Sequence, residues 1–194
     1  MTDSTNCFRL LFYLRADLCR QQALMQGLDK CLSTGFILWM GIISPRFTPV
    51  LLCRLAHWFF LLGLSPIAKL VSLINFFLFG IEIAVRCPIG PGLFFPHTQG
   101  TVIGAWSIGS NATIFQGVTV GAKEIDFSYS ELGRPIICND VTIGSGAKVL
   151  GGITLGNGSR IGANSVVLRS VPSNSLAVGA PAKVVSGALD DPNR

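Results

Sequence analysis

The sequence has 194 residues, which is enough for one domain of ordinary size and a small second one. Hydrophobic residues make up 49% of it, charged residues only 13%, and the mean hydropathy is +0.55. This composition excludes an intrinsically disordered or collagen-like chain. The net charge is +5, but lysine and arginine form no cluster dense enough to predict nucleic-acid binding.

Residues 1–81 are predicted to form a helical domain. This part of the chain holds nine of the 13 phenylalanines and only five of the 22 glycines. Apolar residues recur at helical spacing over residues 8–25, 49–62 and 67–79. We therefore expect three or four helices ahead of the remainder of the chain.

The predicted helices are unusually apolar, and two explanations stay open. Within residues 1–81 the longest uncharged stretches, residues 31–45 and 55–68, are too short for a membrane-spanning helix, which needs roughly 18–20 residues. Residues 1–81 carry seven lysines and arginines against three acidic residues. The apolar faces are expected to pack against one another and against a partner subunit. The alternative is a peripheral contact with an anionic membrane surface.

The start of the chain carries no secretory leader pattern, because Arg9, Arg15, Asp17 and Arg20 interrupt the apolar residues that follow the polar beginning. The six cysteines include no Cys-x-x-Cys pair, so the sequence offers no zinc or redox motif. We expect six reduced thiols in a cytoplasmic protein, with the inner face of the cytoplasmic membrane as an alternative location.

A six-residue period begins where the helices are expected to end. Large apolar residues recur every six positions, with a shift of one residue before Val102 and an interruption at residues 122–135. Such a period predicts a solenoid in which three short strands make one triangular coil and stacked coils bury a column of aliphatic side chains. This domain is expected over residues 82–186, with a tail at residues 187–194. The thirteen periodic positions are Ile83, Ile89, Phe95, Val102, Ile108, Ile114, Val120, Ile137, Ile143, Val149, Leu155, Ile161 and Val167.

Short motifs in and just before the repeats match one known family. They are RLAHW (54–58), IEI (81–83), PH (96–97), TVIG (101–104), QGVTVG (116–121), IGSGAKVLGGITLG (143–156), IGANSVVLRSVP (161–172) and VGAPAKVV (178–185). In these segments the chain resembles the hexapeptide-repeat acyltransferases, most closely their serine acetyltransferase branch. The resemblance implies an α+β fold with a left-handed parallel β-helix, acetyl-CoA as donor and no metal. It also implies a homotrimer with active sites between subunits, and pairing of two trimers is a further option.

A histidine base is the first requirement of O-acetyl transfer, because a hydroxyl must lose its proton as it attacks a thioester. The chain has two histidines, His57 and His97. His57 lies in the apolar segment RLAHWFF and is expected to be structural. His97 stands where the resemblance places the base, and Glu82 stands fifteen residues earlier, where the family has an aspartate that orients it. We predict that Glu82 and His97 are the catalytic residues.

The residues that would bind the acceptor depart from the family pattern. Serine acetyltransferases have an aspartate before the base, where this chain has Pro96, and an arginine–histidine pair in the long loop, where it has Gly133 and Arg134. Arg134 is then the remaining cation for the acceptor, and Pro96 and Gln116 are assigned to the same site. Because a free amino acid has two charged ends, these departures favour a sugar hydroxyl over serine. The sequence resembles the sub-branch of the family that acetylates sugars, which implies a role in surface polysaccharide biosynthesis. Serine is the alternative acceptor.

Acetyl-CoA is expected to lie along the solenoid between two subunits. Ser145 and Ala163 fall where the family has small residues beside the pantetheine arm, and Gly144 and Gly162 next to them allow close approach. The nucleotide phosphates need cations. The candidates for them are Lys148, Arg160 and Lys183.

Three other functions would make different demands on the same residues. A γ-type carbonic anhydrase needs three histidine ligands for zinc, and the repeats contain one histidine. A sugar-nucleotide pyrophosphorylase needs a nucleotide-binding domain, for which the helical segment leaves no room. A non-catalytic assembly subunit stays open, although it gives no reason for Glu82, His97 and the long loop to occur together.

Overall fold

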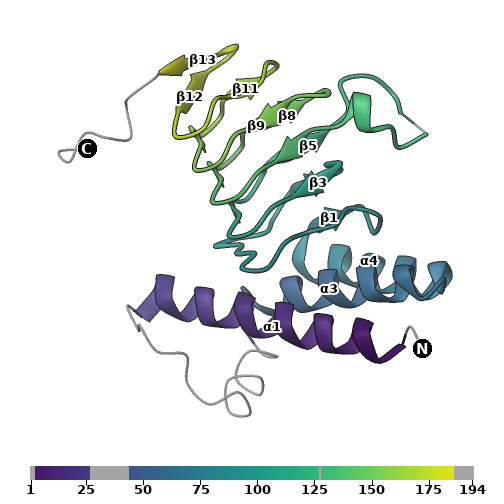
Figure 1. Cartoon of the computed structure of the whole chain (residues 1–194). Coiled ribbons are helices and arrows are strands. Elements are labelled where there is room, and N and C mark those ends of the chain that lie inside the picture. Colours follow the sequence, from purple (N-terminus) through teal and green to yellow (C-terminus); the bar gives the residue numbers. More distant parts are fainter. Residues whose placement is uncertain (1–2, 27–43, 127, 186–194) are drawn as a thin grey trace.

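The computed structural model describes residues 3–26, 44–126 and 128–185, which form helices followed by a stack of short strands (Figure 1). The predicted α+β fold class is confirmed. The helices are α1 (Asp3–Gln26), α3 (Thr48–Leu61) and α4 (Ser65–Phe79), with a short 3-10 helix η1 (Glu131–Gly133) in the long loop. The strands are β1 (Ile81–Ile83), β2 (Thr101–Ile103), β3 (Ser107–Ile108), β4 (Thr113–Ile114), β5 (Thr119–Gly121), β6 (Ile136–Ile137), β7 (Thr142–Ile143), β8 (Lys148–Leu150), β9 (Thr154–Leu155), β10 (Arg160–Ile161), β11 (Val166–Val167), β12 (Leu176–Gly179) and β13 (Ala182–Val185).

The three helical patterns in the sequence all form helices. Pro49 and Pro66 stand in the first turns of α3 and α4, where a residue without a backbone N–H is tolerated. Helix α4 ends at Gly80, whose φ of 63° is left-handed and whose N–H donates to the carbonyl of Phe76 at 2.8 Å. Most of the uncharged stretch at residues 31–45 lies outside the described residues.

The strands form three sheets, one for each side of a triangular coil. The orders are β1-β2-β5-β8-β11, β13-β12-β10-β7-β4 and β3-β6-β9, and neighbouring coils pair in parallel. Where the repeat is regular, paired residues are 18 positions apart, as in Lys148 with Val166 and Thr142 with Arg160. The antiparallel pair β12–β13 ends the stack. This arrangement is the solenoid that the six-residue period predicts.

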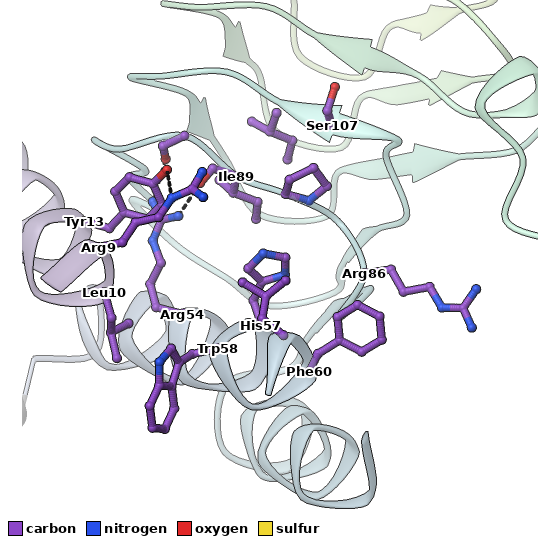
Figure 2. A pocket seen from close by; sticks show the side chains of 14 residues that line it. Arg9, Leu10, Tyr13, Arg54, His57, Trp58, Phe60, Arg86, Ile89 and Ser107 are labelled. Carbon is purple, nitrogen blue, oxygen red and sulfur yellow. Dashed lines mark hydrogen bonds between the residues drawn. The ribbon is translucent and has the colours of Figure 1, made fainter. Parts of the chain in front are cut away.

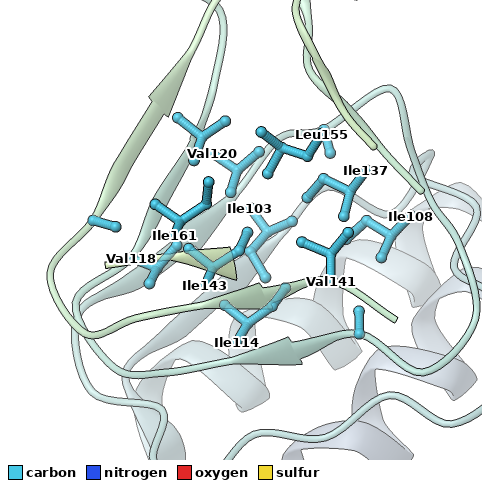
Figure 3. Packing of buried hydrophobic residues seen from close by; sticks show 14 of the residues in the cluster. Ile103, Ile108, Ile114, Val118, Val120, Ile137, Val141, Ile143, Leu155 and Ile161 are labelled. Carbon is cyan, nitrogen blue, oxygen red and sulfur yellow. The ribbon is translucent and has the colours of Figure 1, made fainter. Parts of the chain in front are cut away.

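One column of aliphatic side chains fills the solenoid, and twelve of the thirteen predicted positions are buried in it (Figure 3). The prediction for Val102 is wrong: its side chain is 40% exposed, and Ile103, 1% exposed, takes its place. The buried positions step by eight residues from Phe95 to Ile103 and then by five to Ile108. Two residues are thus inserted at one corner and one is removed at the next, which together mimic a shift of one.

A buried ion pair joins α1, α3 and the first coil of the solenoid. The Arg54 guanidinium donates to both carboxylate oxygens of Asp17, at 2.9 and 3.0 Å, and to the carbonyls of Ile89 and Gly90. Asp17 also accepts the backbone N–H of Leu93 at 2.8 Å. Burial raises the pKa of the Asp17 carboxyl, and the charge and hydrogen bonds of Arg54 oppose that shift. The pair satisfies backbone groups of a coil that has no neighbouring coil on one side.

Two further side chains from the helices, Arg20 and His57, also form hydrogen bonds with backbone carbonyls of the first coils. Arg20 donates to the carbonyls of Gly92 and Ala112. The ring Nδ1 of His57 lies 2.8 Å from the Val85 carbonyl oxygen. Because that oxygen can only accept, His57 carries its proton on Nδ1. The structural role predicted for His57 is consistent with this contact.

Helix α4 leaves an apolar face exposed. Among its residues only Ala68 and Asn75 are buried, while Leu70, Phe77 and Leu78 are 56%, 75% and 64% exposed. Helix α1 exposes Phe8 and Phe12 in the same way. Within the described residues, no helix combines the length and the hydropathy needed to cross a bilayer.

The cysteines differ from the expectation of six reduced thiols. Cys19 is disulfide-bonded, so that expectation is wrong for this residue. Cys53, Cys87 and Cys138 are free thiols. Burial raises the pKa of Cys53 to about 11 and that of Cys87 to about 12, so both are unreactive packing residues at neutral pH.

Replacing Arg54 by methionine should destabilise the fold strongly, because Asp17 would stay buried without its partner. We expect the free energy of unfolding, measured by urea denaturation at fixed protein concentration, to fall by about 3–5 kcal/mol. Arg15→Met, at an exposed position of α1, is the matched control and should change it by less than about 0.5 kcal/mol. Equal urea midpoints for the two variants would contradict the capping role of Arg54.

Candidate active site

Four of the predicted site residues occupy the same position in successive coils. The parallel register aligns Phe94, β4, β7 and β10 residue by residue, and three positions further on the chain turns a corner. The corner residues, in order along the stack, are His97, Gln116, Ser145 and Ala163. We call this edge of the solenoid the His97 corner. It brings together residues from four coils in one line.

The first coil forms the first turn of the His97 corner. This turn contains the two extra residues that lengthen the step from Phe95 to Ile103. The turn, residues 97–100, is held over the end of α4: the Thr98 hydroxyl donates to the Phe79 carbonyl at 2.7 Å, and the Gly100 N–H to the Gly80 carbonyl at 2.9 Å. His97 itself is exposed. The helix end therefore fixes the backbone that carries the predicted base, while the imidazole faces outward.

Glu82 lies on the outer face of β1, at the exposed middle position of that strand. It lines a groove of about 440 Å³ together with Lys69, Ser72 and Phe76 of α4. No ion pair or hydrogen bond joins its carboxylate to His97. The predicted contact is thus not formed within the chain, because the turn of His97 sits over residues 79–80, ahead of Glu82.

The two other residues assigned to the acceptor at this corner differ in what they offer. Pro96 is partly buried, and its carbonyl accepts from the Arg46 side chain at 3.2 Å, so this position supplies no charge. The Gln116 side-chain oxygen is buried and has no hydrogen-bond partner among the described residues. An unpaired buried acceptor of this kind can receive a hydrogen bond from a bound hydroxyl or ammonium group.

Arg134 is tied into the long loop. Its Nε donates to the Asp126 carboxylate at 2.8 Å, Nη2 donates to the Asp126 carbonyl at 3.0 Å, and Nη1 donates to the Gly104 carbonyl at 2.9 Å. The guanidinium also stacks on the ring of Tyr129, whose hydroxyl donates to the Ala105 carbonyl at 2.6 Å. The arginine expected to hold the acceptor therefore shapes the loop, and its contact with an acceptor stays a prediction.

The loop and His97 lie at different corners of the same coil. Arg134 contacts Gly104 just after β2, whereas the His97 turn ends at Gly100 just before it. A strand rises about 3.3 Å per residue, so about 13 Å separates these two ends. Within one chain, His97 and Arg134 do not share one small site.

The residues predicted to bind acetyl-CoA lie on the upper levels of the solenoid. Cβ atoms at Gly144 and Gly162 would stand 2.7 Å from the Ala163 nitrogen and 2.6 Å from a Val178 methyl carbon, so both positions need glycine. Ser145 is partly exposed and Ala163 exposed. These small residues leave the His97 corner narrow.

The three predicted phosphate-binding cations have different surroundings. Lys148 donates to the Gly117 carbonyl at 2.7 Å and to the Thr119 hydroxyl at 3.1 Å. Arg160 on β10 and Lys183 on β13 are exposed. Their assignment to the phosphates stays a prediction.

Two structural residues of the loop were missed in the sequence analysis. Asp126 and Tyr129 organise the loop around Arg134, yet an acidic and an aromatic residue in a polar loop give no distinctive signal. The sequence does place an acidic residue and Arg134 in one excursion, where they can pair, but Glu124 and Glu131 fit that pattern equally well.

Comparison with known proteins agrees with this geometry. The family described as "Bacterial transferase hexapeptide (six repeats)" matches residues 134–169. A serine acetyltransferase of Synechocystis sp. is 40% identical over 104 residues, which are 51% of this chain and 42% of the relative. The crystal structure of the Neisseria gonorrhoeae serine acetyltransferase aligns with a TM-score of 0.81 and 28% identity, over 96% of this chain and 68% of that one.

In its repeats and in its fold the chain is similar to the hexapeptide-repeat acyltransferases, in their serine acetyltransferase-like branch. Its solenoid is the left-handed parallel β-helix of that branch. Two further structures of this hexapeptide-repeat branch carry ligands. The N. gonorrhoeae enzyme in complex with serine aligns at TM-score 0.77, 27% identity, 92% of this chain and 70% of that one. A serine acetyltransferase in complex with CoA aligns with a TM-score of 0.74 and 26% identity, over 91% of this chain and 69% of that one.

This hexapeptide-repeat chain matches only part of its curated relatives. The matched region covers 42%, 32% and 32% of three serine acetyltransferases, from Synechocystis, Bacillus pumilus and Synechococcus elongatus. Among the residues that the structure describes, no three histidine, cysteine or acidic side chains gather in a way that could hold a metal ion.

Gly144→Ala tests the close packing of the hexapeptide-repeat corner. The added Cβ would meet the Ala163 nitrogen and the Ile161 carbonyl oxygen at 2.7 and 2.8 Å, and these backbone atoms must shift. We expect the free energy of unfolding to fall by about 1–3 kcal/mol, measured by thermal denaturation. Gly121→Ala, where a Cβ meets nothing within 4 Å, is the control. Equal stability of the two variants would show that the corner is loosely packed.

Asp126→Asn should loosen the long loop. The Ser128 hydroxyl, the Ser130 N–H and Arg134 together lower the pKa of Asp126 to about 2. A depressed carboxyl pKa stabilises the folded loop above its unfolded value of about 3.9, and that stability is lost as the pH falls toward about 2. At pH 7 we expect amide hydrogen exchange over residues 122–135 to be faster in the variant than in the wild type. In the wild type, exchange corrected for intrinsic rates should become faster only near pH 2–3. Glu124→Gln, at an exposed loop position, should exchange like the wild type, and identical exchange in Asp126→Asn would refute the role of the carboxylate.

Proposed function

We propose that the protein is an acetyl-CoA-dependent O-acetyltransferase. The observation that carries the proposal is the His97 corner, where an exposed histidine begins a line of four corner residues on successive coils, and the last two of these, Ser145 and Ala163, are small. Serine acetyltransferases are the relatives of this chain, and one of them has been solved with CoA. Both facts support acetyl-CoA as the donor, lying along the corner past Ser145 and Ala163.

In the proposed reaction, His97 acts as general base. It takes the proton of the acceptor hydroxyl while the hydroxyl oxygen attacks the thioester carbonyl of acetyl-CoA, and the CoA thiolate leaves. The acetyl group passes directly from CoA to the acceptor oxygen, so no covalent enzyme intermediate is required. Glu82 is assigned to orient His97, which requires its carboxylate to reach the imidazole in the assembled enzyme.

The acceptor that the comparisons favour is L-serine. The relatives named above are serine acetyltransferases, and the N. gonorrhoeae enzyme has been solved with serine. The unpaired oxygen of Gln116 at the same corner offers an acceptor for a serine ammonium or hydroxyl group. Serine thus takes precedence over the sugar acceptor that the sequence departures favour.

A sugar hydroxyl is the second candidate, and specific residues favour it. Pro96 supplies no charge for an ammonium group, and the Arg134 guanidinium is already paired within its loop. A neutral acceptor would need neither charge. The relatives lend this candidate no support, so it depends on these two positions alone.

The assembly we propose is a homotrimer. A separation of about 13 Å between the two ends of β2 prevents His97 and Arg134 of one chain from meeting at one small acceptor. A site that uses both must therefore combine the His97 corner of one chain with the loop of a neighbour. The apolar outer face of α4 is then free for pairing of trimers or for a membrane surface, and a cytoplasmic location stays a prediction.

The decisive measurement is CoA release from acetyl-CoA with L-serine as the only acceptor. We expect serine-dependent release, and a loss of about 10²–10⁴-fold in His97→Ala with an unchanged circular dichroism spectrum. His57→Gln, which removes the other histidine, should keep the activity if it folds.

The other outcomes separate the remaining candidates. Release with nucleotide sugars or lipid-linked saccharides but not with serine would select the sugar acceptor. Full activity of a folded His97→Ala protein would refute the mechanism. A folded protein that binds acetyl-CoA and turns over no acceptor would favour the non-catalytic assembly subunit.

A further inference from the structure

A pocket of about 420 Å³ lies between the helices and the first coils, away from the His97 corner (Figure 2). It is formed where α1 and α3 meet the segment at residues 86–90 and strand β3. None of the residues predicted for catalysis, acceptor or acetyl-CoA lines it. Its volume falls in the range of pockets that hold small organic ligands, roughly 300–1,000 Å³.

The wall of this pocket is mainly apolar. Leu10 comes from α1, Trp58 and Phe60 from α3, and Ile89 and Ile108 from the solenoid. Leu61 also lines it and is 51% exposed, so the apolar surface continues out to the mouth. An apolar body of a ligand would be removed from water on several sides here.

The charge of the pocket has one sign. Three arginines line it and no acidic residue does. The charge of Arg54 is matched by Asp17 behind the wall, but Arg9 and Arg86 form no ion pair with a described residue. Figure 2 places Arg9 and Arg86 on opposite sides of the pocket. Two positive charges are therefore left over beside an apolar cavity.

His57 adds no further charge. Its Nδ1 is hydrogen-bonded to the Val85 carbonyl, burial lowers its pKa, and the charges of Arg54 and Arg9 lower it further, although the Val85 hydrogen bond opposes the shift. At neutral pH the ring is uncharged and its Nε2 is an acceptor. The attraction for an anion thus comes from the two unpaired arginines alone.

We propose that this pocket binds an anionic amphiphile, with an apolar body between α1, α3 and β3 and a phosphate or carboxylate head at the rim, paired with one of the two arginines, Arg9 or Arg86, while the other adds to the attraction for the anion. Guanidinium groups pair well with both head groups through two parallel hydrogen bonds. A cationic amphiphile would be repelled, and a neutral one would leave both charges unmatched. The binding is separate from the acetyl transfer and does not depend on it.

The test is calorimetric titration of the full chain with dodecyl phosphate below its micelle concentration. We expect saturable binding of one molecule per chain. Arg9→Gln/Arg86→Gln should weaken it at least tenfold, and Ser107→Phe, which fills the pocket from β3 without changing charge, should weaken it as much.

The matched control is Arg15→Gln/Arg169→Gln. It removes the same net charge at exposed positions that do not line the pocket, and its affinity should stay within twofold of the wild type. Circular dichroism confirms that each variant folds. The proposal is overturned if dodecyl phosphate does not bind to folded protein, if Arg9→Gln/Arg86→Gln binds as the wild type does, or if dodecanol binds as tightly.

A second arm identifies the source of the ligand. Vesicles of phosphatidylcholine with phosphatidic acid are sedimented with the protein. If both pocket variants lose co-sedimentation, the pocket takes lipid head groups from a bilayer. If they keep it while losing dodecyl phosphate, the pocket takes a free amphiphile, and the vesicles bind elsewhere, such as at the apolar face of α4. Either result retains the site.

Discussion

The open edge of the first coil is the constraint on which the rest of this structure depends. A parallel solenoid satisfies its backbone groups coil against coil, and the first coil has a neighbour on one side only. Arg54 and Arg20 supply donors to its carbonyls, and Asp17 accepts the Leu93 N–H. Without these contacts, buried peptide groups would lose their partners. The helices are therefore the cap that makes the β-helix possible, rather than a separate attachment.

The same cap sets the position of the candidate site. The last carbonyls of α4 hold the turn that carries His97, so the residue proposed as base is positioned by a helix end rather than by a coil below it. The two residues inserted there have room because helix and solenoid meet at that corner. The cap and the corner form one structural unit, and its other face, between α1, α3 and β3, holds the pocket proposed for an amphiphile.

The sequence was sufficient to predict the solenoid and most of its core, because one residue in every six must point toward the axis of the solenoid and be buried there. It could not locate Ile103, since an insertion of two residues followed by a deletion of one has the same net phase as a single shift. The sequence also could not show that Asp17 pairs with Arg54. These residues are 37 positions apart, on two helices that were predicted only from the spacing of their apolar residues. Arg134 was predicted to be the cation for the acceptor, but spacing could not show that Asp126 in the same loop pairs with its guanidinium. Whether Glu82 reaches His97 depends on where β1 begins relative to the turn that carries His97. The spacing of residues in the sequence does not give that position.

The pairing of Arg134 with Asp126 has a thermodynamic consequence for the loop. A segment that becomes ordered only around its substrate loses conformational entropy at the moment of binding, which weakens affinity. Here the carboxylate, the stacked Tyr129 ring and the Gly104 carbonyl order the segment as the chain folds. An acceptor that binds at this loop, as proposed, would meet a surface that already has its shape, so its binding should carry little of the heat-capacity change that accompanies coupled folding.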